Sequence, residues 1–146
     1  MKKILLFLSI LSLQGAGFAA DILMRSFSTP KSEIWAVGFA PEEDLFAAAG
    51  RDATVRLWDY RSGKVKYSLS ATGAVTSLAF DPKGKYLAAG GQSSRISVWS
   101  TGDYALLRTV EAANKKLFAL AYSPDGQYLA AGTDDSVKVW NRGLEL

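Results

Sequence analysis

The sequence predicts an all-β protein built from three copies of one antiparallel sheet module. Trp58, Trp99 and Trp140 are spaced 41 residues apart, and the stretches that end in them resemble one another. Each stretch places turn residues between short apolar runs, and its last run alternates apolar with polar residues. A fixed period of this size is typical of stacked supersecondary units, and alternation is typical of half-buried strands.

The third copy shows the predicted elements most clearly. Residues 122–140 read YSPDGQYLAAGTDDSVKVW. An innermost strand is expected over the apolar run 119–122, followed by a tight Ser-Pro-Asp-Gly turn in which Gly126 takes a positive φ. A short strand over 128–131, a turn at Asp134-Asp135 and an alternating strand over 137–140 complete the unit.

The other two copies follow the same plan. Residues 80–99 read FDPKGKYLAAGGQSSRISVW, which predicts a turn at 82–84 and strands over 86–89 and 95–99. Residues 39–58 read FAPEEDLFAAAGRDATVRLW, with no glycine in the turn, so Asp44 is expected in the left-handed position there. Outermost strands are expected over 64–69 and 104–110, and residues 21–28 resemble another such strand.

These pieces are similar to WD40 repeats, the blades of a β-propeller. The resemblance implies a partial β-propeller of three four-stranded antiparallel WD40-type blades, within a domain spanning 21–146. The blades would cover about 30–70, 71–111 and 113–146, with 21–28 as an extra outer strand. The structural residues of the repeat would be Trp58, Trp99, Trp140, Asp52, Asp134, Gly50, Gly91 and Gly132.

The chain departs from the family at one structural feature, a hydrogen-bond tetrad of Trp, Ser/Thr, Asp and His. That tetrad is not expected here, because alanines or proline occupy its other positions: Ala48, Ala89 and Ala131, and Pro30, Ala71 and Ala113.

Three blades leave two sheet faces open, since propellers use four to eight blades. If each face exposes on the order of 400–500 Å² of apolar surface, it forfeits roughly 10 kcal/mol, against a typical total stability of ~5–15 kcal/mol. We therefore expect a homodimer that closes a six-blade ring, with residues 21–28 of each copy completing the third blade of the other. The alternatives are a different propeller fragment, or a truncated piece of a longer propeller with no independent function.

The first twenty residues have the pattern of a bacterial-type signal peptide. Met1-Lys2-Lys3 is basic, 4–13 is apolar, and 14–20 is small and polar, which predicts cleavage near Ala19 or Ala20. The segment is too short to span a bilayer. The predicted location is the periplasm or the extracellular medium, with no membrane attachment after cleavage. Loss of Lys2 and Lys3 lowers the formal net charge from +3 to +1, so no nucleic-acid partner is expected.

The residue types argue against catalysis. The sequence has no cysteine and no histidine, so it offers no disulfide, no thiolate nucleophile and no Cys/His metal site. The acidic residues 42–44 and Asp134-Asp135 fall in predicted turns, where carboxylates serve local hydrogen bonds. No catalytic residue, metal or cofactor is therefore expected. The alternative class is a periplasmic propeller enzyme of the hydrolase or lactonase type.

The family resemblance implies a non-catalytic scaffold that binds protein partners at one mouth of the central channel. The residues that flank the first apolar position of each innermost strand would line that mouth. Exposed aromatics such as Trp35 and Phe118 are favoured binding anchors, although packing between blades is the alternative role for both. The candidate binding residues are Glu33, Trp35, Ala74, Thr76, Lys116 and Phe118.

Overall fold

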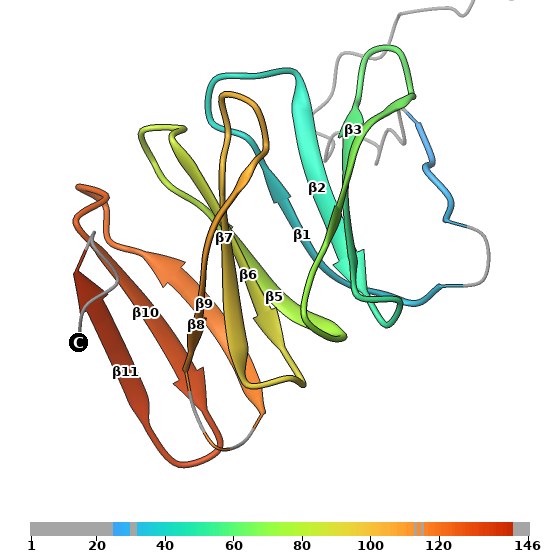
Figure 1. Ribbon diagram of the computed structural model, residues 1–146. Coiled ribbons are helices and arrows are strands. Elements are labelled where there is room, and N and C mark those ends of the chain that lie inside the picture. Colours follow the sequence, from blue (N-terminus) through green and yellow to red (C-terminus); the bar gives the residue numbers. More distant parts are fainter. Residues whose placement is uncertain (1–24, 30–31, 113, 115, 142–146) are drawn as a thin grey trace, which may run out of the picture.

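The computed structural model shows three antiparallel sheets standing side by side, which confirms the predicted all-β class (Figure 1). The structure describes residues 25–29, 32–112, 114 and 116–141. The predicted signal peptide and its cleavage near Ala19 or Ala20 lie outside the described residues.

Each sheet arises from one repeat, with its strands in sequence order. The first sheet contains β1 (Ile34–Phe39), β2 (Leu45–Gly50), β3 (Thr54–Asp59) and β4 (Val65–Ser70). The second contains β5 (Val75–Phe80), β6 (Tyr86–Gly91), β7 (Arg95–Ser100) and β8 (Leu106–Glu111). The third contains β9 (Leu117–Tyr122), β10 (Tyr128–Thr133) and β11 (Val137–Asn141), with β11 outermost among the described residues.

The innermost strands bring the three sheets together. β1 packs beside β5 and β5 beside β9, so the sheets fan out from this shared inner side as blades do. We call the three sheets blade 1, blade 2 and blade 3. One apolar core fills the space between blades 1 and 2, and a second fills the space between blades 2 and 3.

The turns between first and second strands differ between blades. Gly84 and Gly126 have φ of +65° and +71°, which confirms the predicted role of the turn glycines. The expectation for Asp44 was wrong, because the described non-glycine residues with positive φ are Ala53, Ser94 and Tyr104. The blade 1 turn closes through a 3.0 Å hydrogen bond from Ala40 N to Leu45 O. Bonds of the same span close the other two turns, from Asp81 N to Tyr86 O at 2.8 Å and from Ser123 N to Tyr128 O at 2.9 Å. The Asp44 side chain binds Tyr60 and Arg61.

Two strand glycines lie where another backbone approaches closely. A Cβ on Gly50 would come within 1.8 Å of Glu33 O, and one on Gly91 within 2.1 Å of Ala74 O. Both face a register shift at the start of the innermost strand, the kind of irregularity at which glycine is favoured. In blade 3 the residue in this register is Thr133, whose backbone N–H donates to Ser136 O at 2.9 Å.

The described part of the predicted outer strand, residues 25–28, has no strand conformation. It lies against blade 1, where the Phe27 ring packs edge-on against Phe46 and Trp58 at centroid distances of 4.8 and 5.6 Å. Arg25 Nη1 also donates a 2.8 Å hydrogen bond to Arg61 O. Residues 21–24 lie outside the described part of the chain.

Candidate interaction surface

The six candidate binding residues lie around the first positions of β1, β5 and β9. Because these strands pack side by side, the candidates form a row along one end of the blades. The row contains Glu33 and Trp35 on blade 1, Ala74 and Thr76 on blade 2, and Lys116 and Phe118 on blade 3. The members of this row differ in what their side chains contact.

On blade 1 the candidates form an exposed aromatic and charged group. Trp35 Nε1 donates to Glu33 Oε2 at 3.1 Å, and Arg51 Nη1 donates to Glu33 Oε1 at 3.1 Å. The Trp35 side chain is 40% exposed, so Glu33 holds an indole and a guanidinium at the surface. Aromatic and arginine side chains presented together are favoured anchors for protein partners. Arg51 belongs to this group, although sequence reasoning missed it.

On blade 2 the candidates serve the backbone. The Thr76 hydroxyl donates to the carbonyl of Leu117 on blade 3, and Ala74 O accepts from Gln92 N at 2.9 Å. Thr76 is half-buried. Its hydroxyl therefore joins two blades, and blade 2 acts mainly as a spacer within the row.

On blade 3 both candidates are exposed. Phe118 is 54% exposed, and Lys116 beside it is also exposed. The structure thus places Phe118 and Lys116 at the blade 3 end of the row. At the blade 1 end it places Trp35 with Glu33 and Arg51.

The structural residues of the repeat occupy two kinds of place. Trp99 and Trp140 are buried against the preceding blade, whereas Trp58 is half-buried on the open side of blade 1. Asp52 accepts a 3.1 Å hydrogen bond from Thr54 N and pairs with Arg56 at 2.7 Å. Asp134 is exposed in its turn. The Cβ position of Gly132 meets only the Ala119 side chain, at 3.6 Å.

The open side of blade 1 carries apolar side chains that sequence reasoning did not single out. Val37 is 68% exposed and Phe39 is 71% exposed. The Phe39 ring contacts Phe46 at 6.0 Å and Tyr60 at 5.9 Å between centroids. We call this surface the leading face and define it by Val37, Phe39, Phe46 and Trp58.

The open side of blade 3 is also apolar. Val137 is 72% exposed and Val139 is 50% exposed, and Tyr128 is exposed beside them. We call this surface the trailing face and define it by Tyr128, Ala130, Val137 and Val139.

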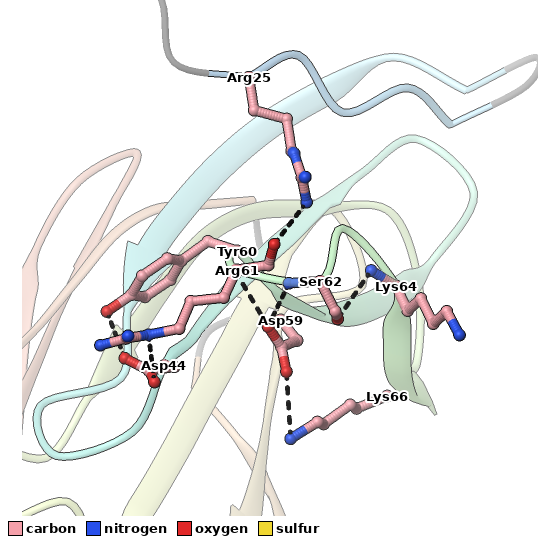
Figure 2. Close-up of polar contacts among 8 residues, drawn as sticks. All are labelled: Arg25, Asp44, Asp59, Tyr60, Arg61, Ser62, Lys64 and Lys66. Atoms are coloured by element: carbon pink, nitrogen blue, oxygen red, sulfur yellow. Dashed lines mark hydrogen bonds and ion pairs between the residues drawn. The ribbon is translucent and has the colours of Figure 1, made fainter.

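A polar network closes the edge of blade 1 next to the leading face (Figure 2). Tyr60 Oη donates to Asp44 Oδ1 at 2.7 Å, and Arg61 forms an ion pair with the same carboxylate. The hydrogen bonds from Tyr60 and then Arg61 hold the pKa of Asp44 below its usual range. The hydrogen bond that the Tyr60 hydroxyl donates to Asp44 also raises the pKa of Tyr60.

The turn between β3 and β4 is organised by a second carboxylate. Asp59 Oδ1 accepts from Arg61 N at 3.0 Å and Ser62 N at 2.9 Å, and Lys66 lies 3.4 Å from its other oxygen. These contacts, led by the Ser62 backbone N–H, lower the pKa of Asp59. Figure 2 shows Arg25 reaching this turn, where it anchors the segment 25–28.

A hollow of about 400 Å³ lies between that segment and the turn, lined by Arg25, Ser26, Phe27, Ser28, Trp58, Ser62 and Gly63. In the described residues no group of three or more acidic, histidine or cysteine side chains is placed to hold a metal ion. The same part of the chain contains no helix long and apolar enough to cross a membrane.

The repeat detected by its period matches a known family. The family described as "WD domain, G-beta repeat" matches residues 22–59, 63–100 and 104–141. This chain belongs to the WD40 family. The exposed row and both open faces are therefore features of a WD40 arc.

Solved WD40 structures share the fold. The structure titled "Crystal structure of RRP9 WD40 repeats" superposes with a TM-score of 0.76 at 25% identity, covering 82% of this chain and 38% of that one. "Structure of U3-55K" superposes with a TM-score of 0.77 at 24% identity, covering 82% of this chain and 39% of that one.

Related sequences cover shorter stretches. The chain is 38% identical to small ribosomal subunit protein RACK1y of Oryza sativa subsp. japonica over 64 residues, 44% of this chain and 19% of that protein. It is 32% identical to protein Atg16l2 of Mus musculus over 75 residues, 49% of this chain and 12% of that protein. The probable cytosolic iron-sulfur protein assembly protein Ciao1 of Culex quinquefasciatus is 26% identical over 96 residues, 61% of this chain and 28% of that protein. The matched stretch is thus a minor part of each relative.

Proposed function

We propose that this chain is a non-catalytic protein-interaction scaffold of the WD40 type that is exported to the periplasm or the medium. The observation that carries the scaffold role is the exposed group of Trp35, Glu33 and Arg51, held together by two 3.1 Å hydrogen bonds at the end of blade 1. Phe118 and Lys116 extend the same row on blade 3. A protein partner with an extended peptide or loop suits a row of spaced anchors.

The binding test compares three forms of the protein in retention of partners from a periplasmic extract. The double variant Trp35→Ala, Phe118→Ala should lose a partner that the wild type retains, while its melting temperature stays close to that of the wild type. The control is Leu107→Ala, which removes an exposed apolar side chain from β8, away from the row. Equal retention by all three forms, or a large fall in melting temperature in the double variant, contradicts the proposal.

Export is proposed from the pattern of residues 1–20, with the basic start, apolar run and small-residue exit. Expression of the full chain in a Gram-negative bacterium should yield a periplasmic product that begins after Ala19 or Ala20, as read by mass spectrometry. A full-length product confined to the cytoplasm argues against export.

We further propose that one protein partner is a second copy of this chain, and that two copies close a ring of six blades. The number is favoured because six is the multiple of three that lies within the usual four to eight blades.

A further inference from the structure

The leading and trailing faces are built from the same positions that are buried between blades. In the sheet registers, Trp58 is equivalent to Trp99 and Trp140, and Phe46 to Leu87 and Leu129. The blade 2 and blade 3 members of both sets are buried against the preceding blade. The leading face is therefore a surface of the type that receives a preceding blade in this molecule.

The trailing face has the opposite character. Val139 is equivalent to Leu57 and Val98, each paired with an alanine of the neighbouring strand. Leu57 and Val98 are buried against the following blade, whereas Val139 is half exposed. The trailing face is thus a surface of the type that receives a following blade.

The trailing face repeats the register of the blade 2 surface that meets blade 3. Blade 2 presents Tyr86, Ala88 and Gly90 toward blade 3, and blade 3 presents Tyr128, Ala130 and Gly132 in the same register. A Cβ on Gly90 would approach Leu117 Cδ1 at 3.2 Å, so glycine makes room for the first residue of the following blade. Gly132 leaves the same room for Ile34 of a second copy.

The next contact along the strand fits as well. Ala79 of blade 2 packs into the core that contains Leu120 of blade 3. The equivalent pair across a new junction is Ala121 and Val37, and valine is smaller than leucine. At this contact the docked faces therefore need no larger space than the one already observed between blades 2 and 3.

The segment 25–28 supplies a second and independent observation. Leu69 on the outer strand β4 packs into the core between blades 1 and 2, and Val110 on the outer strand β8 packs into the core between blades 2 and 3. Each thus contacts the core that its own blade shares with the following blade. Phe27 occupies the corresponding place in front of blade 1, against Phe46 and Trp58. In blades 1 and 2 the third strand pairs with such an outer strand, whereas β11 is the outermost strand of its sheet in the described residues.

We propose that the trailing face of one copy docks on the leading face of a second copy, and that the segment containing Phe27 becomes the outer strand beside β11 of that partner. This inference rests on the proposed scaffold function and specifies a second copy as the partner and the surfaces used. Two such junctions close the ring head to tail.

The test uses charge substitutions on side chains that are exposed in a single copy. Val37→Glu alters the leading face and Val139→Glu alters the trailing face, and both should leave circular dichroism unchanged. Leu107→Glu is the control, because Leu107 is 53% exposed although blade 2 has neighbours on both sides. Multi-angle light scattering on the purified protein gives the mass of each form.

The wild type and Leu107→Glu should have the mass of two copies. Val37→Glu and Val139→Glu should each be monomeric, with the dissociation constant raised roughly a hundredfold or more by an unpaired charge in the interface. An equimolar mixture of these two variants should regain the mass of two copies, because one junction then joins two unaltered faces. Only head-to-tail docking predicts this rescue.

A folded wild-type monomer at high concentration overturns the proposal, as does a dimer that persists in both variants. A dimer that only one of the two variants disrupts indicates face-to-face docking and also overturns it. A stable complex with a different protein on these faces, formed by a monomeric wild type, has the same consequence. Loss of binding through Trp35 and Phe118 is measured separately, so failure of the scaffold function is distinguishable from failure of this inference.

Discussion

Asp81 shows how a single turn residue joins two blades. Its side chain is buried, with Oδ1 accepting from Lys83 N at 3.3 Å and Oδ2 from Lys85 N at 3.2 Å. It therefore fixes its own hairpin turn. The same carboxylate lies against the turn of blade 3, where a Cβ on Gly126 would come within 2.4 Å of Asp81 Oδ1.

This contact predicts that Gly126→Ala is more destabilising than Gly84→Ala. Both glycines have a positive φ, so each substitution carries a similar backbone cost of about 1–2 kcal/mol. The Cβ position of Gly84 meets only Glu42 Cγ at 3.9 Å, whereas that of Gly126 collides with Asp81. We expect an additional loss of about 1–3 kcal/mol for Gly126→Ala from overpacking.

Urea denaturation of both variants measures the difference between their free energies of unfolding. Equal losses would mean that the turn of blade 3 shifts away from Asp81 at no cost, contrary to the prediction. The comparison is direct because the two glycines occupy the same position of equivalent turns.

The sequence predicts the conformation of Gly126 but not its neighbour. A Pro-Asp-Gly turn specifies a positive φ by local sterics, so local residues are sufficient. Asp81 lies 45 positions earlier in the chain, and its contact depends on how blades 2 and 3 dock. Thr76 illustrates the same limit, since its role in joining blades becomes visible only when Leu117 is placed beside it.

Strand β8 shows the corresponding limit for elements. The position of residues 104–110 after the turn at 101–103 predicts an outer strand from Tyr104, but β8 begins at Leu106. Tyr104 instead has a φ of +55° and is buried, with its ring 4.4 Å from that of Tyr67 on blade 1. Burial raises the pKa of its hydroxyl. Packing against the neighbouring blade thus overrides the strand preference of tyrosine, which sequence patterns alone do not reveal.

The innermost strands are joined differently at the two junctions between blades. Ser77 Oγ on β5 accepts a 2.9 Å hydrogen bond from Leu120 N on β9. In the sheet registers the equivalent of Ser77 on β1 is Ala36, and that of Leu120 on β5 is Leu78. The junction between blades 1 and 2 therefore has an alanine where the next junction has a hydroxyl acceptor.

This difference predicts opposite effects of two substitutions. Ser77→Ala should speed amide hydrogen exchange at Leu120 and cost about 1–3 kcal/mol, because a backbone donor loses its acceptor. Ala36→Ser should slow exchange at Leu78, since the new hydroxyl stands in the equivalent register. Exchange measured by NMR on both variants and the wild type tests the pair, and an unchanged rate at Leu120 in Ser77→Ala would refute the role of Ser77.

At the scale of the whole molecule, the period and its turns predict the number and order of the blades and two open faces, while the residues that form those faces follow only from the structure. The repeat places equivalent residues at Val98 and Val139, but sequence does not state which side of a strand meets the next blade. The burial of these side chains in the structure settles this, because Val98 is buried against blade 3 and its counterpart Val139 is half exposed. Stability depends on the same arrangement, because each apolar core lies between two neighbouring blades and is formed by both of them.

The response of the molecule to acid follows from its carboxylates. Hydrogen bonds to the charged form lower the pKa of several aspartates below the ordinary value of about 3.9. The leading donors are the Tyr60 hydroxyl, the Ser62 backbone, the Ala105 backbone and the Ser123 hydroxyl, for Asp44, Asp59, Asp103 and Asp125 respectively. These groups bind fewer protons in the folded state than in the unfolded state at acid pH.

The free energy of unfolding should therefore be constant between about pH 5 and 7 and fall as the pH drops below about 4. Because the folded-state pKa values of these aspartates are depressed, their contribution to stability is complete at a pH above the unfolded-state pKa. That contribution is lost as the pH falls through the folded-state pKa values. The flat region is expected because the sequence contains no histidine or cysteine that would titrate there. Urea denaturation across pH 2 to 7 measures the curve.

Two substitutions at Asp59 distinguish the effect of its negative charge on stability from the effect of the hydrogen bonds that it accepts. Asp59→Asn keeps an oxygen that accepts from Arg61 N and Ser62 N but does not titrate, so its acid slope should be shallower than that of the wild type. Asp59→Ala loses the acceptor as well, so its stability should be lower than that of Asp59→Asn at every pH because both turn N–H groups lose their partner. An acid slope in Asp59→Asn as steep as the wild type would show that the charge of Asp59 does not contribute, and equal stability of the two variants would show that its hydrogen bonds do not.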